Sequence, residues 1–150
     1  MLRIDMNKWR LFLTYRKGVA AEQQLVRWLK DRGYETQRAA GSRGAADILA
    51  AKKGLLGFGQ KKYAIQVKST SEDKYRIAKK EIEELSEFAD KFDSNAVLAI
   101  RFLGEKWRFW TGGGEDWEAK SPLYRLLDEK EPYVLLKTND KEAELFEQAF

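Results

Sequence analysis

The chain has 150 residues, the usual size of one compact domain, and it contains neither Cys nor His. This composition excludes disulfides, zinc sites built from Cys and His, and Cys or Ser–His nucleophiles, so we expect any metal to be held by oxygen. The 28 Lys and Arg residues outnumber the 24 Asp and Glu residues, and the net charge of +4 permits a polyanionic partner without proving one.

Two features bear on location. No apolar run approaches the roughly 18 residues that a membrane span needs. The first residues, 1–6, carry an early acid and lack the basic-then-apolar order of a secretory signal. We therefore expect a cytoplasmic protein without a membrane partner, folded as a single domain over 1–150.

Hydrophobic spacing predicts the elements in chain order. Leu25, Val26 and Leu29 share one helical face, which predicts a helix over 19–32 that ends at Gly33. A strand and a hairpin follow, then an amphipathic helix, two strands and weaker helical signals near the C-terminus. The expected strands are 34–39, 47–51, 62–68, 96–102 and 107–110, and the expected later helices are 79–92, 123–127 and 141–150. This order predicts an α/β domain with a mixed central sheet flanked by helices.

Glu22 is the first residue that needs a chemical explanation. Leu25, Val26 and Leu29 follow it at three, four and seven residues, so Glu22 is expected to face the core. A carboxylate in an apolar stripe is costly unless a cation or a metal compensates it. The alternative is a helix edge at which Glu22 lies in water or pairs with a nearby Arg.

Three more polar groups converge on the predicted hairpin. Gln66 and Lys68 share one face of their strand, and Asp47 begins the strand expected to pair with it. Together with Glu22 they make a set of oxygen ligands beside an ammonium group. Mg²⁺ prefers such ligands and promotes phosphodiester hydrolysis by activating a water, which Lys68 would orient or help deprotonate. The alternative is an edge strand with a solvated face.

The order and spacing of several motifs resemble those of the archaeal Holliday junction resolvases. The resemblance covers roughly residues 15–110, between an N-terminal extension over 1–14 and a C-terminal extension over 111–150. Its core is similar to the PD-(D/E)xK nuclease motif, here in a Gln-x-Lys variant. The motifs are Arg16-Lys17-Gly18, Glu22, Arg38-Ala39-Ala40-Gly41-Ser42, Ala46-Asp47-Ile48, Gln66-Val67-Lys68-Ser69 and Phe88-Ala89-Asp90-Lys91-Phe92.

This resemblance implies a restriction-endonuclease-like fold and a homodimer that binds a four-way DNA junction and nicks two opposed strands. It implies metal ligands at Asp47, Gln66 and Glu22, with Lys68 beside the attacking water and Ser42 near the scissile backbone. The implied cofactor is Mg²⁺, for which Mn²⁺ is expected to substitute. Basic residues and a small-residue loop can approach phosphates without reading bases. The implied DNA contacts are Arg16, Lys17, Arg38, Ser42 and Arg43. The resemblance leaves open a recombination or replication protein as a further partner.

Two departures from the family pattern keep alternatives open. Ala46 stands where the motif usually has Pro, and Gln66 replaces the usual acid, which removes a negative charge from the metal site. One alternative is a related nuclease acting on other duplex or branched DNA. Another is a catalytically weakened junction-binding module, and a third is a structural α/β protein with a basic face.

Three further groups are not assigned to the site. They are the basic cluster Lys74, Arg76, Lys79 and Lys80 near the start of the second helix, the aromatic group Trp107, Phe109 and Trp110, and the apolar hairpin tip 55–59. The basic cluster either contacts DNA or forms a solvated face. Strand aromatics are more often core or dimer interface than a base-stacking platform. The hairpin tip either contacts a partner or folds onto its own domain.

Overall fold

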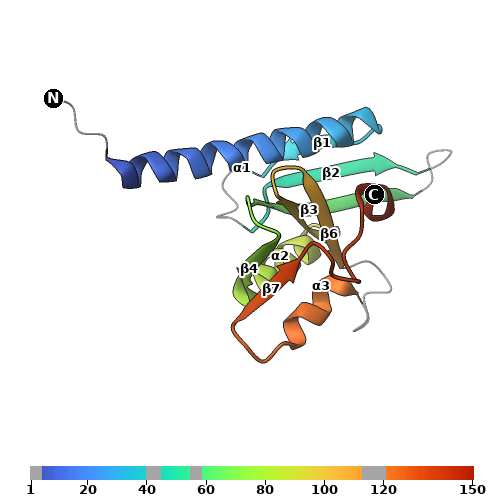
Figure 1. The fold of residues 1–150 in the computed structure, drawn as a ribbon. Coiled ribbons are helices and arrows are strands. Elements are labelled where there is room, and N and C mark those ends of the chain that lie inside the picture. The colour runs from blue at the N-terminus through green and yellow to red at the C-terminus, as the bar shows by residue number, and fades with distance from the viewer. Residues whose placement is uncertain (1–4, 40–44, 55–58, 113–120) are drawn as a thin grey trace.

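A computed structural model describes residues 5–39, 45–54, 59–112 and 121–150, with the side chains of 11–17 outside the described part. Five strands form a mixed central sheet in the order β1-β2-β3-β5-β6 (Figure 1). Only the β3–β5 pair is parallel, and the other neighbours in this sheet are antiparallel. The strands are β1 (Glu35–Arg38), β2 (Ile48–Lys53), β3 (Gln60–Ser69), β5 (Asn95–Phe102) and β6 (Lys106–Gly112). β3 lies in the middle of the sheet, and its central residues, 63–67, are buried.

One helix packs on each face of the central sheet, which confirms the predicted α/β class. On one face, α1 (Met6–Asp31) buries Ala21, Leu25 and Leu29 against β2, β3, β5 and β6. On the other face, α2 (Lys79–Lys91) buries a stripe of apolar side chains in a second core cluster. These two clusters place the apolar side chains of β3 alternately toward α1 and α2, since successive residues of a strand face opposite sides.

A second, two-stranded sheet lies beside α2 and α3 in the lower half of Figure 1. It pairs β4 (Lys74–Ala78) with β7 (Tyr133–Lys137) in antiparallel register. Between them in the chain lie α3 (Pro122–Arg125) and a 3-10 helix (Leu126–Asp128), and α4 (Phe146–Ala149) follows. The aromatic rings of Phe146 and Phe150 pack beside α1 and close the first core cluster at its edge.

The structure corrects two of the predicted elements and adds two strands. The first helix begins at Met6 rather than at 19, and its start is capped by Asp5, whose carboxylate accepts from the N–H of Asn7. Residues 6–10 are exposed and project beyond the sheet in Figure 1, so this part of the helix needs no apolar stripe. The terminal helix is short, because the chain around Glu144 runs extended beside Phe109. Strands β4 and β7 were not predicted.

The aromatic group of β6 belongs to the core. Trp107 is 5% exposed, and Phe109 and Trp110 are fully buried. Their burial excludes a base-stacking platform at these residues, because stacking needs an accessible ring face. No helix in the described part of the chain is long and apolar enough to cross a membrane.

Candidate active site

Asp47 is fixed at the start of β2 by both neighbouring strands. Its N–H donates to the carbonyl of Ile65 at 2.8 Å, and its carbonyl accepts from the N–H of Ala39 at 3.0 Å. One carboxylate oxygen, Oδ2, accepts from the Val67 N–H at 2.8 Å and from Gln66 Nε2 at 3.0 Å. Burial raises the pKa of Asp47, and the Val67 N–H is the first of the groups that oppose this rise. The carboxylate is therefore held firmly against β3.

Gln66 is a buried polar residue in the middle strand of the sheet. It is only 6% exposed, and its amide nitrogen is the group that donates to Asp47. Its carbonyl oxygen, Oε1, is buried and has no hydrogen-bond partner among the described residues. An unsatisfied buried acceptor is uncommon and suggests a missing partner. The position of β3 between β2 and β5 excludes the alternative of an edge strand with a solvated face.

Glu22 lies at the margin of the α1 core face and pairs with Arg38 on β1. The Arg38 Nη2–Glu22 Oε2 distance is 3.2 Å, and the Glu22 side chain is 19% exposed whereas that of Arg38 is 68% exposed. Burial and then the negative charge of Asp47 raise the pKa of Glu22, while Arg38 partly offsets them. Both the inward position and the Arg partner considered from the sequence are therefore present together.

Lys68 extends from the same face of β3 as Gln66 and forms an ion pair with the first turn of α2. Its Nζ lies 3.0 Å from Glu81 Oε1. Burial lowers the pKa of Lys68, but Tyr75, Glu81 and Asp47 together outweigh burial and raise it. Lys68 is consequently a cation at neutral pH. Glu81 and Tyr75 were not predicted from the sequence, because only the packing of α2 and β4 beside β3 brings them to Lys68.

The donor set fits a cation that prefers oxygen. Glu22 and Asp47 supply two carboxylates that interact electrostatically, and the unpartnered Oε1 of Gln66 supplies a neutral oxygen close by. Within the described ranges, no group of three or more His, Cys, Asp or Glu side chains is placed to hold a metal. If Glu22 and Asp47 hold a metal, the amide oxygen of Gln66 is the neutral oxygen that could join them as a third ligand.

Several predicted DNA contacts cannot be placed. Ser42 and Arg43 lie outside the described residues, and so does most of the hairpin tip 55–59. Arg16 and Lys17 lie in α1, but their side chains fall outside the described part.

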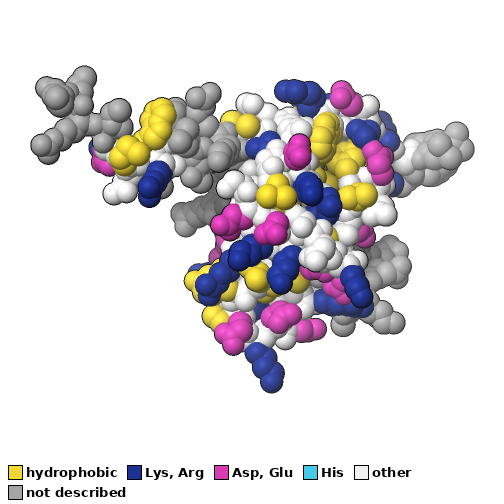
Figure 2. Space-filling model, in the orientation of Figure 1, with side chains coloured by type: hydrophobic (Ala, Val, Ile, Leu, Met, Phe, Trp, Pro, Cys, Tyr) yellow, Lys and Arg dark blue, Asp and Glu magenta, His cyan; other side chains and the backbone are white. Residues whose placement is uncertain are grey.

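The basic cluster around the second helix is split between two elements. Lys74 and Arg76 are on β4, whereas Lys79 and Lys80 begin α2. The Arg76 guanidinium lies 4.5 Å from the ring centroid of Tyr133, and Lys79 donates to the Glu129 carbonyl. Figure 2 shows Lys and Arg side chains gathered with apolar ones over β4 and β7. At least two of the four cations thus contact the protein itself.

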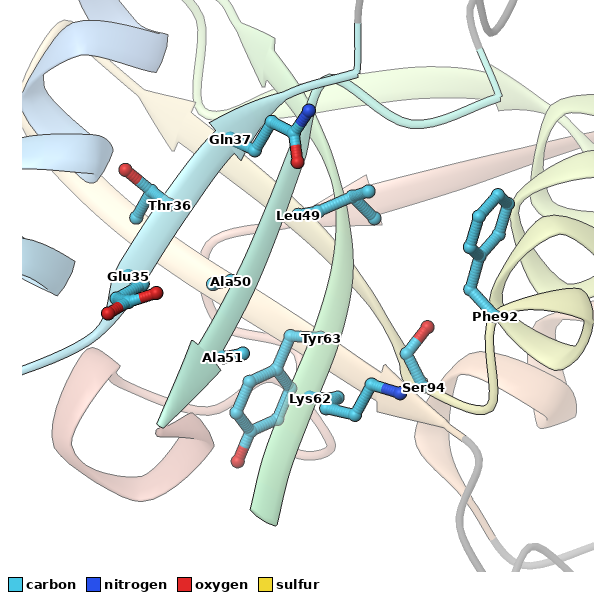
Figure 3. A pocket seen from close by; sticks show the side chains of 10 residues that line it. All are labelled: Glu35, Thr36, Gln37, Leu49, Ala50, Ala51, Lys62, Tyr63, Phe92 and Ser94. Atoms are coloured by element: carbon cyan, nitrogen blue, oxygen red, sulfur yellow. The ribbon is translucent and has the colours of Figure 1, made fainter. Parts of the chain in front are cut away.

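A separate hollow of about 280 Å³ shares no lining residue with the four-residue site. Figure 3 shows Phe92, which follows α2, across from Leu49 of β2. Phe92 is 51% exposed, and its ring centroid lies 4.7 Å from that of Phe88. The polar rim includes Glu35 and Lys62, two side chains of opposite charge.

The helix-flanked mixed sheet, with an aspartate, an amide and a lysine on its adjacent central strands, has the fold of the restriction-endonuclease-like nucleases. The family model described as archaeal Holliday junction resolvase (hjc) matches residues 13–120. Since this match covers more than half of the chain, the protein belongs to the archaeal Holliday junction resolvase family.

Two relatives illustrate the similarity. Crossover junction endodeoxyribonuclease Hjc of Methanocaldococcus jannaschii is 37% identical over 91 residues, which are 61% of this chain. The match spans 63% of that relative's length. The solved structure of Archaeoglobus fulgidus Hjc, a Holliday junction resolvase from an archaeal hyperthermophile, is 27% identical with a TM-score of 0.59 and covers 81% of this chain and 84% of that chain.

Proposed function

We propose that the protein is a structure-specific DNA endonuclease that resolves four-way junctions by nicking two opposed strands. The observation that carries this proposal is the Asp47 carboxylate, held by Gln66 and the Val67 N–H beside Glu22 and Lys68. Membership of the archaeal resolvase family supports a junction as the substrate. A shape-specific substrate also agrees with the net charge of +4, because phosphate contacts carry no sequence information.

Each site residue has a role that its environment supports. Asp47, Glu22 and the Gln66 amide oxygen would hold Mg²⁺, with Mn²⁺ able to replace it. When bound, the metal neutralises charge developing on the phosphate and lowers the pKa of a water molecule. Lys68, protonated beside Glu81, donates hydrogen bonds that orient the attacking water or a phosphate oxygen. In this role Lys68 acts as a donor rather than a base.

We propose a homodimer with the hollow of Figure 3 as its contact surface, because two opposed nicks need two active sites related by a twofold axis. Phe92 is half exposed beside an apolar floor that includes Leu49. A twofold interface must complement itself, and the rim supplies both Glu35 and Lys62 for such pairing across it.

The presence of Gln66 in place of an acidic residue favours a second candidate function, a junction-binding module with little or no turnover. Gln66 donates a hydrogen bond to Asp47 from the position of the family's additional acid, so the site contains two carboxylates. A lower negative charge weakens Mg²⁺ binding. The same fold and the same DNA surface would then hold a junction without cutting it.

A cleavage experiment separates these candidates. Labelled four-way junction and matched linear duplex are incubated with the protein in Mg²⁺, alongside Lys68→Ala, Gln66→Glu and the surface control Lys106→Ala. The nuclease proposal predicts paired symmetric nicks on the junction alone, lost in Lys68→Ala and retained in Lys106→Ala. Junction binding without cleavage, with activity gained in Gln66→Glu, would instead establish the binding module. Cleavage of linear duplex would point to a related nuclease with another substrate.

A further inference from the structure

A basic groove opens directly from the candidate active site, between α1 and the edge strand β1. It has a volume of about 410 Å³. The lining residues are Glu22, Gln23, Val26, Arg27, Lys30, Thr36 and Arg38. At one end Glu22 and Arg38 form the ion pair of the site, and α1 carries the groove from there toward Lys30. The groove is therefore continuous with the place where we expect the phosphodiester bond to be cut.

The groove has a net positive charge. Its cations are Arg27, Lys30 and Arg38, and its one carboxylate, Glu22, already pairs with Arg38. Arg27 and Lys30 are exposed, and neither forms an ion pair within the described part of the chain. By contrast, Arg32, two residues beyond Lys30, pairs with Glu147. Two cations in the groove thus remain available to an anion from outside.

The remaining polar lining suits phosphate oxygens. Thr36 offers a hydroxyl and Gln23 an amide, and both groups are common donors to the DNA backbone. Thr36 and Arg38 lie on the same face of β1, since they are two residues apart in a strand. Lys30 follows Glu22 by eight residues, which is about 12 Å along the helix axis at about 1.5 Å per residue. A DNA strand advances about 3.4 Å per nucleotide, so this distance corresponds to roughly three to four nucleotides.

We infer that this groove is a second phosphate-binding site, in which Arg27 and Lys30 hold the backbone of the strand roughly two to four nucleotides from the cut. The inference rests on the proposed junction-cleaving function and adds to it the path of the bound strand. The groove recognises the charge and spacing of phosphates rather than the identity of bases, because its cations and hydrogen-bond donors contact phosphate oxygens. It thereby positions the scissile phosphate beside Asp47 and Lys68.

The test measures junction binding without cleavage. Fluorescence anisotropy in EDTA gives the affinity of the full-length protein for a labelled four-way junction over a range of salt concentrations. The variant Arg27→Gln/Lys30→Gln is compared with Lys130→Gln/Lys141→Gln, which removes the same two charges from the exposed C-terminal segment. Far-UV circular dichroism and thermal melting establish that both double variants fold.

Counterion release sets the expected size of the effect. Each lost phosphate contact reduces the salt slope by about 0.9, so the groove variant should lose about 1.8 for each protomer and about 3.6 for the proposed dimer. At 0.1 M salt the loss for the dimer corresponds to roughly 4,000-fold weaker binding. The control should keep the wild-type slope. An unchanged salt slope in Arg27→Gln/Lys30→Gln would overturn the proposed groove site. Equal losses of slope in the groove variant and the control would also overturn it, because they would show a general effect of net charge.

A second arm places the contact on the DNA. Junctions carry a single neutral methylphosphonate at successive positions on either side of the cut. Neutral groups two to four nucleotides from the cut on one side should weaken binding to wild type and have no added effect on Arg27→Gln/Lys30→Gln. Additive losses in the variant would contradict the inference. A wild-type protein that binds no junction would overturn the proposed function as well, so the two failures are distinguishable.

Discussion

Gln66→Glu tests the geometry of the site most directly. In the wild type, Gln66 Nε2 donates to Asp47 Oδ2 at 3.0 Å. The substitution replaces this donor with a second carboxylate at about the same distance. Two unit charges 3.0 Å apart repel by about 5.5 kcal/mol at an effective dielectric constant of about 20. Protonating an ordinary glutamic acid at pH 7 costs only about 3 to 4 kcal/mol, so the introduced carboxyl takes up a proton instead.

The expected destabilisation of Gln66→Glu is therefore about 3 kcal/mol at pH 7 in EDTA. The folded-state pKa of the introduced carboxyl lies above its unfolded value, so the penalty is absent below the unfolded pKa, grows as the pH rises above it, and becomes constant above the folded pKa. Urea unfolding between pH 5 and pH 8 measures this dependence. Millimolar Mg²⁺ should reduce the penalty, because a cation between two carboxylates removes their repulsion.

The matched control is Gln60→Glu, the same chemical change at an exposed position at the start of β3. It should alter the free energy of unfolding by less than about 0.5 kcal/mol at every pH. Equal stability of Gln66→Glu and wild type at pH 8 in EDTA would refute the reasoning, because the two side chains could not then face each other as described.

Three further predictions concern other contacts. Glu81→Gln removes the partner of Lys68, so the single-turnover cleavage rate should fall roughly tenfold while junction affinity is unchanged. Lys68→Ala should lower the same rate a hundredfold or more. Equal losses in the two variants would make Glu81 part of the chemistry rather than a positioning residue. Phe92→Asp places a charge on the proposed dimer surface, so sedimentation should show a monomer of nearly wild-type stability, and a persisting dimer would locate the interface elsewhere. Burial and the neighbouring Tyr34 raise the pKa of Tyr63 to about 12. In urea unfolding, the wild type should therefore lose about 2 to 3 kcal/mol of stability between pH 10 and pH 12, and Tyr63→Phe should lack this loss. Identical alkaline stability profiles of the two proteins would contradict this prediction.

The candidate site followed largely from local patterns. The alternation of side chains along a strand placed Gln66 and Lys68 on one face, and hairpin pairing brought Asp47 beside them. Helical spacing turned Glu22 toward the sheet. These relationships extend over a few residues or across one hairpin, and the backbone geometry of helices and strands is enough to predict them.

Other partners depended on contacts between distant segments. The sequence pattern did not indicate that Glu81 would pair with Lys68, because that ion pair requires α2 to pack beside β3. Strands β4 and β7 are each five residues long. They were not recognisable from the sequence, because each forms only by pairing with the other, with Lys74 opposite Lys137. Short strands far apart in sequence are stabilised by each other rather than by local preference.

The sequence by itself therefore determined the α/β class, the central hairpin and the polar residues that converge on it, since each is written in a periodicity of two or 3.6 residues. The tertiary structure alone decided that β3 is the middle strand, that Lys68 is held by Glu81, and that α1 and β1 leave a basic groove beside Arg38. Those features arise from packing between helices and strands, and the local pattern of one segment does not indicate which other segment will pack against it.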